Sequence, residues 1–355
     1  MDVMAGYRGD VFIVNGVVAP TARVPAGIVR LRFVNGANAR FFDLRFSDSR
    51  TFNVIGSDGG YLPVPVPLQR LLFAPGERYE VLVDFSDGRQ VTLLTGPDRN
   101  LPMMGMMMGG AMPADGGNLL TFEVDTSLPV SAKALPRALV SVPAIDRENV
   151  IKTRQFMLND MMMGSGMMMG GRGGSIMAIN GKPFEMDRID VSTKRGTIEL
   201  WQIESRMMGH PFHVHGTQFQ ILSMDKQRPP AHMQGWKDTV IVAQEAEILV
   251  PFSQPASADA AFMFHCHILE HEDAGMMGQY ICAWQSDLRC HQPRRCHQPQ
   301  AGVGDTKTAL KTTVSPTSPT SPTVWRVIRE NGCVMSEIHS PIENVCTEVG
   351  DTKGW

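Results

Sequence analysis

A short histidine-rich stretch with one cysteine constrains this chain more than any other feature. Residues 264–276 read Phe-His-Cys-His-Ile-Leu-Glu-His-Glu-Asp-Ala-Gly-Met, which places His271 five residues and Met276 ten residues after Cys266. A thiolate, an imidazole and a thioether at this spacing predict a type 1 (blue) copper centre, which takes one Cys, two His and a weak axial Met. Met277 is an adjacent alternative for the axial position.

The second imidazole of such a centre has to come from another part of the chain. The stretch His-Pro-Phe-His-Val-His at residues 210–215 can supply it, and His210 is the predicted ligand. All ten His lie at or after residue 210, and many of the 25 Met are clustered, so the composition also favours copper. The predicted type 1 ligands are His210, Cys266, His271 and Met276.

The residues beside the cysteine predict a second metal site. Successive side chains of a strand point to opposite faces, so Cys266 is expected on one face and His265 and His267 on the other. His213 and His215 likewise share one face because they are two residues apart. One short segment can therefore hold a copper through its Cys and reach a second metal cluster through its flanking His.

The first part of the chain is predicted to be all-β. Apolar and polar residues alternate in runs such as 29–33, 42–46 and 79–85, a pattern that is typical of half-buried strands. Asn-Gly and Asp-Gly pairs separate these runs as turn signals. The pattern predicts a Greek-key β-sandwich over residues 1–125.

The rest of the chain divides into three predicted segments. Residues 126–174 are expected to comprise a proline-containing linker and a methionine-rich segment. Residues 175–285 are expected to form a second all-β domain that contains both histidine stretches. Residues 286–355 include a Ser-Pro-Thr repeat and are expected to be a disordered tail. The predicted fold class is therefore all-β, with two β-sandwich domains.

Two methionine clusters interrupt the strand pattern. Six Met lie within residues 103–112 and seven within residues 157–169, and both groups are interleaved with Gly, which disfavours a core helix. The clusters can be a flexible, low-complexity apolar loop, or a thioether-rich surface that captures the soft ion Cu(I). We favour Cu(I) capture because the predicted blue-copper motif lies in the same chain.

The two histidine stretches resemble the carboxy-terminal half of a multicopper oxidase. The resemblance rests on residues 210–215 and on His-Cys-His-Ile-X-X-His-X-X-X-Gly-Met at 265–276. His-Gly-Thr-Gln-Phe at 215–219, Gly-Trp-Lys-Asp-Thr-Val at 235–240 and the methionine clusters resemble the bacterial copper efflux (cuprous) oxidases most. The similarity extends from about Gly9 to about Trp284.

The resemblance implies two cupredoxin-like domains. Residues 1–125 correspond to a middle domain without copper ligands, and residues 175–285 to the carboxy-terminal domain with them. A trinuclear copper cluster is implied beside the type 1 site. Its implied ligands in this chain are His213 for the type 2 copper and His215, His265 and His267 for the type 3 coppers.

The resemblance also implies an activity. Electrons would enter at the type 1 copper and pass through Cys266, His265 and His267 to the cluster, where O2 is reduced to water. Glu272 is the implied proton-handling residue. The implied donor is Cu(I) or a phenol, and the implied location is the periplasm. The implied Cu(I)-binding residues are Met157, Asp160 and Met208.

The family carries further His-X-His motifs in an amino-terminal cupredoxin domain, and no His precedes His210 in this chain. The expected activity is therefore either that of an oxidase completed by a missing amino-terminal domain, or that of a truncated copper-binding and electron-transfer module without O2 reduction. A nonfunctional remnant is the third alternative.

The net charge of −3 gives no indication that the chain binds nucleic acid. The sequence shows no apolar run long enough to span a membrane and no signal peptide.

Overall fold

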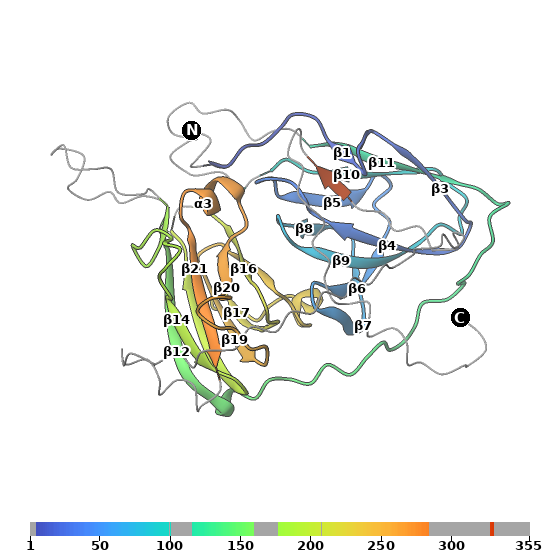
Figure 1. The fold of residues 1–355 in the computed structure, drawn as a ribbon. Helices are drawn as coiled ribbons and strands as arrows, with labels where there is room; N and C mark the ends of the chain where they lie inside the picture. The colour runs from blue at the N-terminus through green and yellow to red at the C-terminus, as the bar shows by residue number, and fades with distance from the viewer. Residues whose placement is uncertain are drawn as a thin grey trace, which may run out of the picture.

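The computed structural model describes residues 5–98, 100, 116–159, 177–206, 208–283 and 327–329. Within these residues the chain forms two β-sandwiches that lie side by side (Figure 1). Asp160 and both methionine clusters, apart from Met157, lie outside the described residues.

The first sandwich consists of a sheet with strand order β3-β11-β10-β5-β8 and a sheet with strand order β4-β9-β6-β7. The strands are β3 (Thr21–Val24), β4 (Ile28–Val34), β5 (Phe42–Phe46), β6 (Phe52–Ser57), β7 (Gly60–Leu68), β8 (Leu71–Phe73), β9 (Arg78–Asp84), β10 (Val91–Thr95) and β11 (Gly117–Val124). A small sheet, β2-β1-β22, adjoins them; its strands are β1 (Ile13–Val14), β2 (Val17–Val18) and β22 (Val327–Arg329).

Alternating burial holds the first sandwich together. Measured between ring centroids, Phe46 of β5 lies 6.0 Å from Phe122 of β11 in the same sheet and 5.9 Å from Phe52 of β6 in the other sheet, so the second contact joins the two sheets. All three side chains are at most 1% exposed. The period-two pattern of the sequence therefore predicted the inward-facing residues correctly, because apolar burial stabilises this alternation.

The second sandwich consists of a sheet with strand order β13-β12-β15-β19-β17 and a sheet with strand order β14-β21-β20-β16-β18. The strands are β12 (Val150–Asn159), β13 (Ala178–Ile179), β14 (Val191–Lys194), β15 (Thr197–Glu204), β16 (His210–Val214), β17 (Gln220–Met224), β18 (Thr239–Val242), β19 (Glu245–Phe252), β20 (Phe262–Cys266) and β21 (Met277–Ala283). The described helical segments are η1 (Arg147–Asn149), η2 (Ala231–Met233) and α3 (Leu269–Asp273).

A buried tryptophan links the two sheets of the second sandwich. Trp201 of β15 is fully buried and lies 4.7 Å from Phe156 of β12 and 5.4 Å from Phe264 of β20, between ring centroids. Cys266, two residues after Phe264, belongs to the same core cluster. The cysteine of the predicted blue-copper motif therefore lies on the inner face of the sandwich.

The segment between the sandwiches differs from the sequence prediction in one respect. β12 pairs in parallel with β15, so residues 150–159 of the predicted linker and methionine-rich segment (126–174) form part of the second sandwich. Its alternating residues were overlooked because the methionine cluster that follows dominates the pattern. The residues before it run along one side of the molecule from β11 to β12 (green in Figure 1). The other domain boundaries stay predictions.

The predicted all-β fold class is confirmed for the described residues. Residues 286–326 and 330–355 of the expected tail lie outside the description, and the three described residues between them form β22, which pairs with β1. Within the described residues, no helix is long and apolar enough to span a lipid bilayer.

Candidate metal centre

The two histidine stretches lie on neighbouring antiparallel strands. In the register of β16 and β20, Phe212 pairs with Cys266 and His213 pairs with His265. Paired residues of two strands point to the same face of a sheet. Phe212 and Cys266 are therefore directed into the core, whereas His213 and His265 are directed to the opposite face, as the sequence indicated.

Three candidate ligands meet at the inner face. The Sγ atom of Cys266 lies 3.3 Å from Nδ1 of His210 and 3.5 Å from Nδ1 of His271, and the two Nδ1 atoms are 3.2 Å apart. All three side chains are fully buried. One thiol and two imidazoles that converge on one point form the donor set of a type 1 copper site.

Met276 is better placed than Met277 for the axial position. Its side chain is fully buried and belongs to the same core cluster as Cys266. Its backbone N–H donates to the carbonyl of His271 (2.8 Å), and its carbonyl accepts from the N–H of Cys266 (3.2 Å). Met277 instead begins β21 and pairs with His265. The short helix α3 and the turn after it therefore bring His271 and Met276 back toward the cysteine.

A second group of histidines meets on the other face. Ligating atoms of His213, His215 and His265 all lie within 4.8 Å of one another. The Nε2 atoms of His215 and His265 are 3.0 Å apart. The His267 ring lies beside this group, 5.7 Å from the His265 ring and 5.8 Å from the His213 ring. The four predicted cluster ligands are therefore neighbours, with three of them in the tighter group.

Hydrogen bonds orient two of these rings. The Nδ1 atom of His213 lies 3.0 Å from the carbonyl oxygen of Asp238, which can only accept, so Nδ1 carries the proton and donates. Likewise, Nδ1 of His265 donates to the carbonyl oxygen of Cys266 (2.9 Å) and lies 3.1 Å from Oε2 of Glu272. These bonds leave Nε2 of each ring available to a metal, which is how outer partners usually fix histidine ligands.

Comparison with known proteins shows which family the chain belongs to. Two family models, each described as multicopper oxidase, match residues 9–92 and 152–285. The chain belongs to the multicopper oxidase family. A laccase-like multicopper oxidase named CueO from Ochrobactrum sp. is similar in structure, with 46% sequence identity and a TM-score of 0.69, over 80% of this chain and 62% of that one. A laccase from Pediococcus acidilactici is 32% identical with a TM-score of 0.63, over 79% of this chain and 55% of that one.

The curated relatives of this multicopper oxidase family member are named for cell division and not for an oxidase activity. The cell division protein FtsP of Xenorhabdus nematophila is 38% identical over 280 residues, which are 78% of this chain and 55% of that protein. The chain spans about half the length of the curated relatives it matches. Family membership, the cupredoxin-like β-sandwich fold and the implied use of copper are therefore shown, whereas an activity does not follow from these relatives.

Burial favours the neutral form of two of the candidate cluster imidazoles, those of His215 and His267. Burial, followed by the charges of His213 and His265, lowers the pKa of His215 to about 4 and that of His267 to about 3. Burial raises the pKa of Glu272, but its contact with His265 and the charges of neighbouring histidines outweigh this, so its pKa lies below the ordinary value. Neutral imidazoles beside a carboxylate are the protonation states that metal ligation requires.

A buried charge cluster lies between the two sandwiches, and sequence reasoning missed it. Nζ of Lys237 lies 2.9 Å from Oδ2 of Asp58 and 3.0 Å from Oε1 of Glu77, and none of the three side chains is exposed. Asp238, the next residue, pairs with Arg78 of β9. The motif at 235–240 was a signal for Lys237 and Asp238, but their partners lie about 160 to 180 positions away, and no local pattern points to them.

The predicted Cu(I)-binding residues lie in different settings. Met208 is 6% exposed and belongs to the core of the second sandwich, two residues before His210. Met157 is half-buried on β12, where it pairs with Glu204 of β15. Asp160 lies outside the described residues. A Cu(I) site formed by these three residues stays a prediction.

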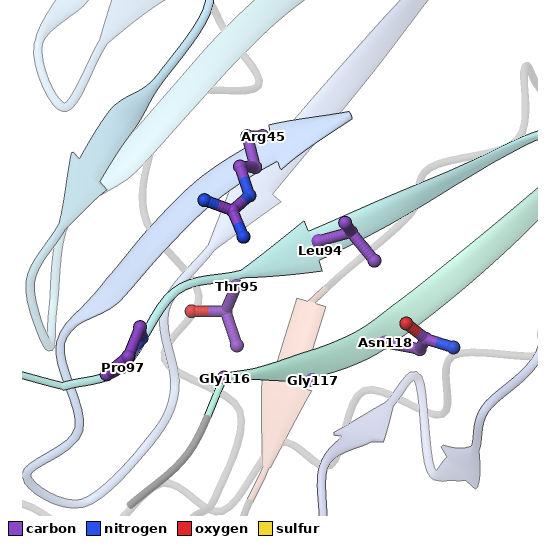
Figure 2. Close-up of a pocket in the computed structure, with 7 residues that line it drawn as sticks. All are labelled: Arg45, Leu94, Thr95, Pro97, Gly116, Gly117 and Asn118. Carbon is purple, nitrogen blue, oxygen red and sulfur yellow. The ribbon is translucent and has the colours of Figure 1, made fainter. Parts of the chain in front are cut away.

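A pocket of about 360 Å³ lies at one end of the first sandwich, where β10 and β11 meet. Figure 2 shows its lining residues, which are Arg45, Leu94, Thr95, Pro97, Gly116, Gly117 and Asn118. None of the predicted ligands or Cu(I)-binding residues lines it. We therefore assign this pocket no role in copper chemistry.

Proposed function

We propose that this chain is the electron-accepting part of a copper oxidase that takes electrons from Cu(I) and delivers them to O2. One observation carries the proposal. Two groups of candidate metal ligands lie on opposite faces of β20 and are joined through consecutive residues, with Cys266 in one group and His265 in the other. A site that only stores copper has no need for a second ligand group directly behind its cysteine.

The residues fit copper at the first group. A buried thiol between two imidazoles, with a buried thioether supported by the same backbone, is a soft donor set that suits copper better than Mg²⁺ or Ca²⁺. The backbone N–H of Ile268 lies 3.4 Å from Sγ of Cys266 and stabilises negative charge on the sulfur. We assign His210, Cys266, His271 and Met276 to the type 1 copper.

The second group also fits. His213, His215 and His265 converge, and Nδ1 of His267 is buried without a hydrogen-bond partner among the described residues. We assign His213 to the type 2 copper and His215, His265 and His267 to the type 3 coppers. When bound, these coppers supply one-electron redox chemistry toward O2.

The protein's own residues provide the connection between the two sites. The covalent path runs from the sulfur of Cys266 along the backbone to His265 and His267. The hydrogen bond from Nδ1 of His265 to the carbonyl of Cys266 gives a second, shorter path. Glu272, 24% exposed and in contact with His265, lies at the edge of the group, where it can hold or pass on a proton from solvent.

The proposal names Cu(I) as the donor, with phenols as a second class. The methionine clusters support Cu(I), and the similarity to a laccase-like multicopper oxidase with oxidase activity toward lignin model compounds supports phenols. A trinuclear cluster needs more than four imidazoles, so the proposal includes another cupredoxin domain that supplies the rest. A periplasmic location, as the family resemblance implies, is also part of it.

A second candidate function comes from the curated relatives, which are named for cell division. Such a role does not require O2 chemistry and is compatible with a copper-binding or electron-transfer module. The converging Cys and His donors favour the oxidase, because a purely structural role gives no reason to retain all of them.

The test is O2 consumption by the copper-loaded full chain combined with an added amino-terminal cupredoxin domain of a family member, measured with Cu(I) and with a phenol as donor. We expect Cu(I)-dependent uptake of O2 that Cys266→Ser abolishes. Deleting residues 103–112 and 161–169 should depress Cu(I) oxidation more than phenol oxidation. A blue protein that consumes no O2, alone or with an added amino-terminal domain of a family member, would replace the oxidase by the electron-transfer module.

A further inference from the structure

Among the charged residues between the two sandwiches, the half-buried Asp238 contacts the histidine group directly. Arg78, the first residue of β9 in the first sandwich, donates two hydrogen bonds to Asp238 in the second, from Nη1 to Oδ1 (2.7 Å) and from Nη2 to Oδ2 (2.6 Å). A two-pronged guanidinium–carboxylate pair fixes orientation as well as charge. Asp238 precedes β18, the strand that pairs with β16.

Asp58 holds the same segment by its backbone. Its Oδ2 atom accepts from the N–H groups of Asp238 (3.4 Å) and Thr239 (3.3 Å), and its Oδ1 atom accepts from the N–H of Arg78 (2.8 Å). Lys237 neutralises this buried carboxylate at 2.9 Å. The first sandwich thus fixes both the side chain and the main chain of residues 237–239.

This fixed segment surrounds one nitrogen of His213. Its Nδ1 atom lies 3.0 Å from the carbonyl oxygen of Asp238, 3.0 Å from Oγ1 of Thr239 and 3.4 Å from Oδ1 of Asp238. The hydroxyl of Thr239 in turn donates to Oδ1 of Asp238 (3.0 Å). Every partner of Nδ1 therefore belongs to residues that Arg78 and Asp58 hold.

We infer that Arg78 and Asp238 are positioning residues that fix the proton of His213 on Nδ1 and so present Nε2 to the metal. The first sandwich would thereby set the copper affinity of a site to which it contributes no imidazole. This inference rests on the proposed function in one respect, namely that the His213 group binds copper.

An ordinary ion pair between two domains is the alternative explanation. The Arg78 side chain is 33% exposed and that of Asp238 is 14% exposed, so the pair is partly accessible to solvent. If the Arg78–Asp238 pair only joins the sandwiches, weakening this pair leaves the tautomer of His213 and the copper affinity of the second site unchanged. The two explanations therefore differ in what they predict for His213.

The experiment compares Arg78→Met with Arg78→Lys in the full chain, and Arg50→Met is the matched control. Arg50 also joins two carboxylates in the first sandwich, those of Asp48 and Asp87, but no contact of it reaches a histidine among the described residues. With the type 1 site already filled, Cu(II) is titrated onto the second site against a competing chelator. The tautomer of His213 is measured by long-range ¹H–¹⁵N NMR on the metal-free proteins.

We expect Arg78→Met to lower the Cu(II) affinity of the second site about 10- to 100-fold, the usual range for an outer partner of a metal ligand. The blue band of the type 1 site should stay, Arg78→Lys should recover part of the affinity, and Arg50→Met should match the wild type. In the metal-free protein, His213 should change from the Nδ1–H form to a mixture of tautomers.

Unchanged affinity and an unchanged tautomer in Arg78→Met would overturn the inference, as would an equal loss in Arg50→Met. If the wild type binds no second copper, the proposed function fails, and the tautomer comparison alone decides the inference. If Arg78→Met does not fold, Arg78→Lys decides it, because a wild-type tautomer and affinity in that variant would show that the two-pronged geometry is not needed.

Discussion

The two sandwiches of this molecule are built alike but use their shared interface differently. The second sandwich directs imidazoles and a thiol toward the candidate metal centre. The first sandwich contains no histidine, and it contributes buried carboxylates and a guanidinium instead. The comparison supports our inference that a domain without metal ligands helps to define a metal site, because it holds the segment that contacts the candidate ligand His213. The predictions below test this division.

The first prediction tests whether the second sandwich alone makes the blue site. Cys266→Ser should abolish the blue band completely, because a hydroxyl cannot replace the thiolate from which the colour arises. Visible absorption of the copper-loaded protein measures this. Arg78→Met, which alters the first sandwich, should keep the band. A blue Cys266→Ser protein would mean that Cys266 is not the ligand.

The second prediction concerns the buried cation that both sandwiches share. Lys237→Met should lower the free energy of unfolding by about 3–5 kcal/mol, because it leaves Asp58 and Glu77 buried without their partner. Burial lowers the pKa of Lys237, but the two carboxylates raise it well above the ordinary value, so the side chain is charged near neutral pH. Denaturant unfolding measures the change.

Lys226→Met is the matched control for this loss. The Lys226 side chain is 81% exposed and pairs with Glu245 at 3.7 Å, so its removal should change the stability by no more than about 0.5 kcal/mol. Similar losses in both variants would contradict the view that the buried cluster joins the sandwiches.

The third prediction compares two neighbouring methionines in the second sandwich. Met276→Leu should keep the blue band and raise the reduction potential of the type 1 copper, because a weak donor to Cu(II) is lost. Met277→Leu should leave the potential unchanged, since Met277 pairs with His265 on β20 and β21 rather than packing with Cys266. Redox titration of the blue band distinguishes them, and the reverse result would reassign the axial ligand to Met277.

The fourth prediction concerns pH and the metal-free protein. Folding depresses the pKa of His215 from 6.5 to about 4 and that of His267 from 6.5 to about 3. A depressed pKa means that the unfolded chain binds more protons, so this contribution is complete above about pH 6.5 and is lost as the pH falls toward 4. The free energy of unfolding should therefore decrease over this range.

His215→Gln should make that decrease shallower, because one of the two imidazoles with a depressed pKa is gone. His232 stays in both proteins and adds a contribution of the same sign, since burial and Lys237 lower its pKa to about 4. Parallel stability curves for the wild type and His215→Gln would mean that His215 is not held neutral by the fold.

Local pattern predicted a large part of this molecule. Period-two alternation predicted strands of the first sandwich, because burial on one face imposes that period. The face of each candidate ligand also followed from strand geometry, so the convergence of His210, Cys266 and His271 could be expected from two short stretches. The strand β12 was overlooked, because the methionine-rich sequence after it dominated that region.

Contacts across the interface could not be predicted in the same way. Lys237 and Asp238 stand in a motif that marks the family, but the motif does not say which groups they meet. Asp58, Glu77 and Arg78 come from turns and strand ends of an ordinary β pattern, about 160 to 180 positions earlier. Charged residues at such positions are usually solvated, and only the packing of the two sandwiches shows that Asp58 and Glu77 are buried.

The most direct test of this account is the copper content of the full chain together with its visible absorption and its electron paramagnetic resonance spectrum. The account predicts one blue type 1 copper per chain and a second, non-blue Cu(II) that is lost when His213 and His215 are both replaced by Gln. Copper that binds without a blue band, or a blue protein in which the double replacement changes nothing further, would contradict the two-site arrangement on β16 and β20.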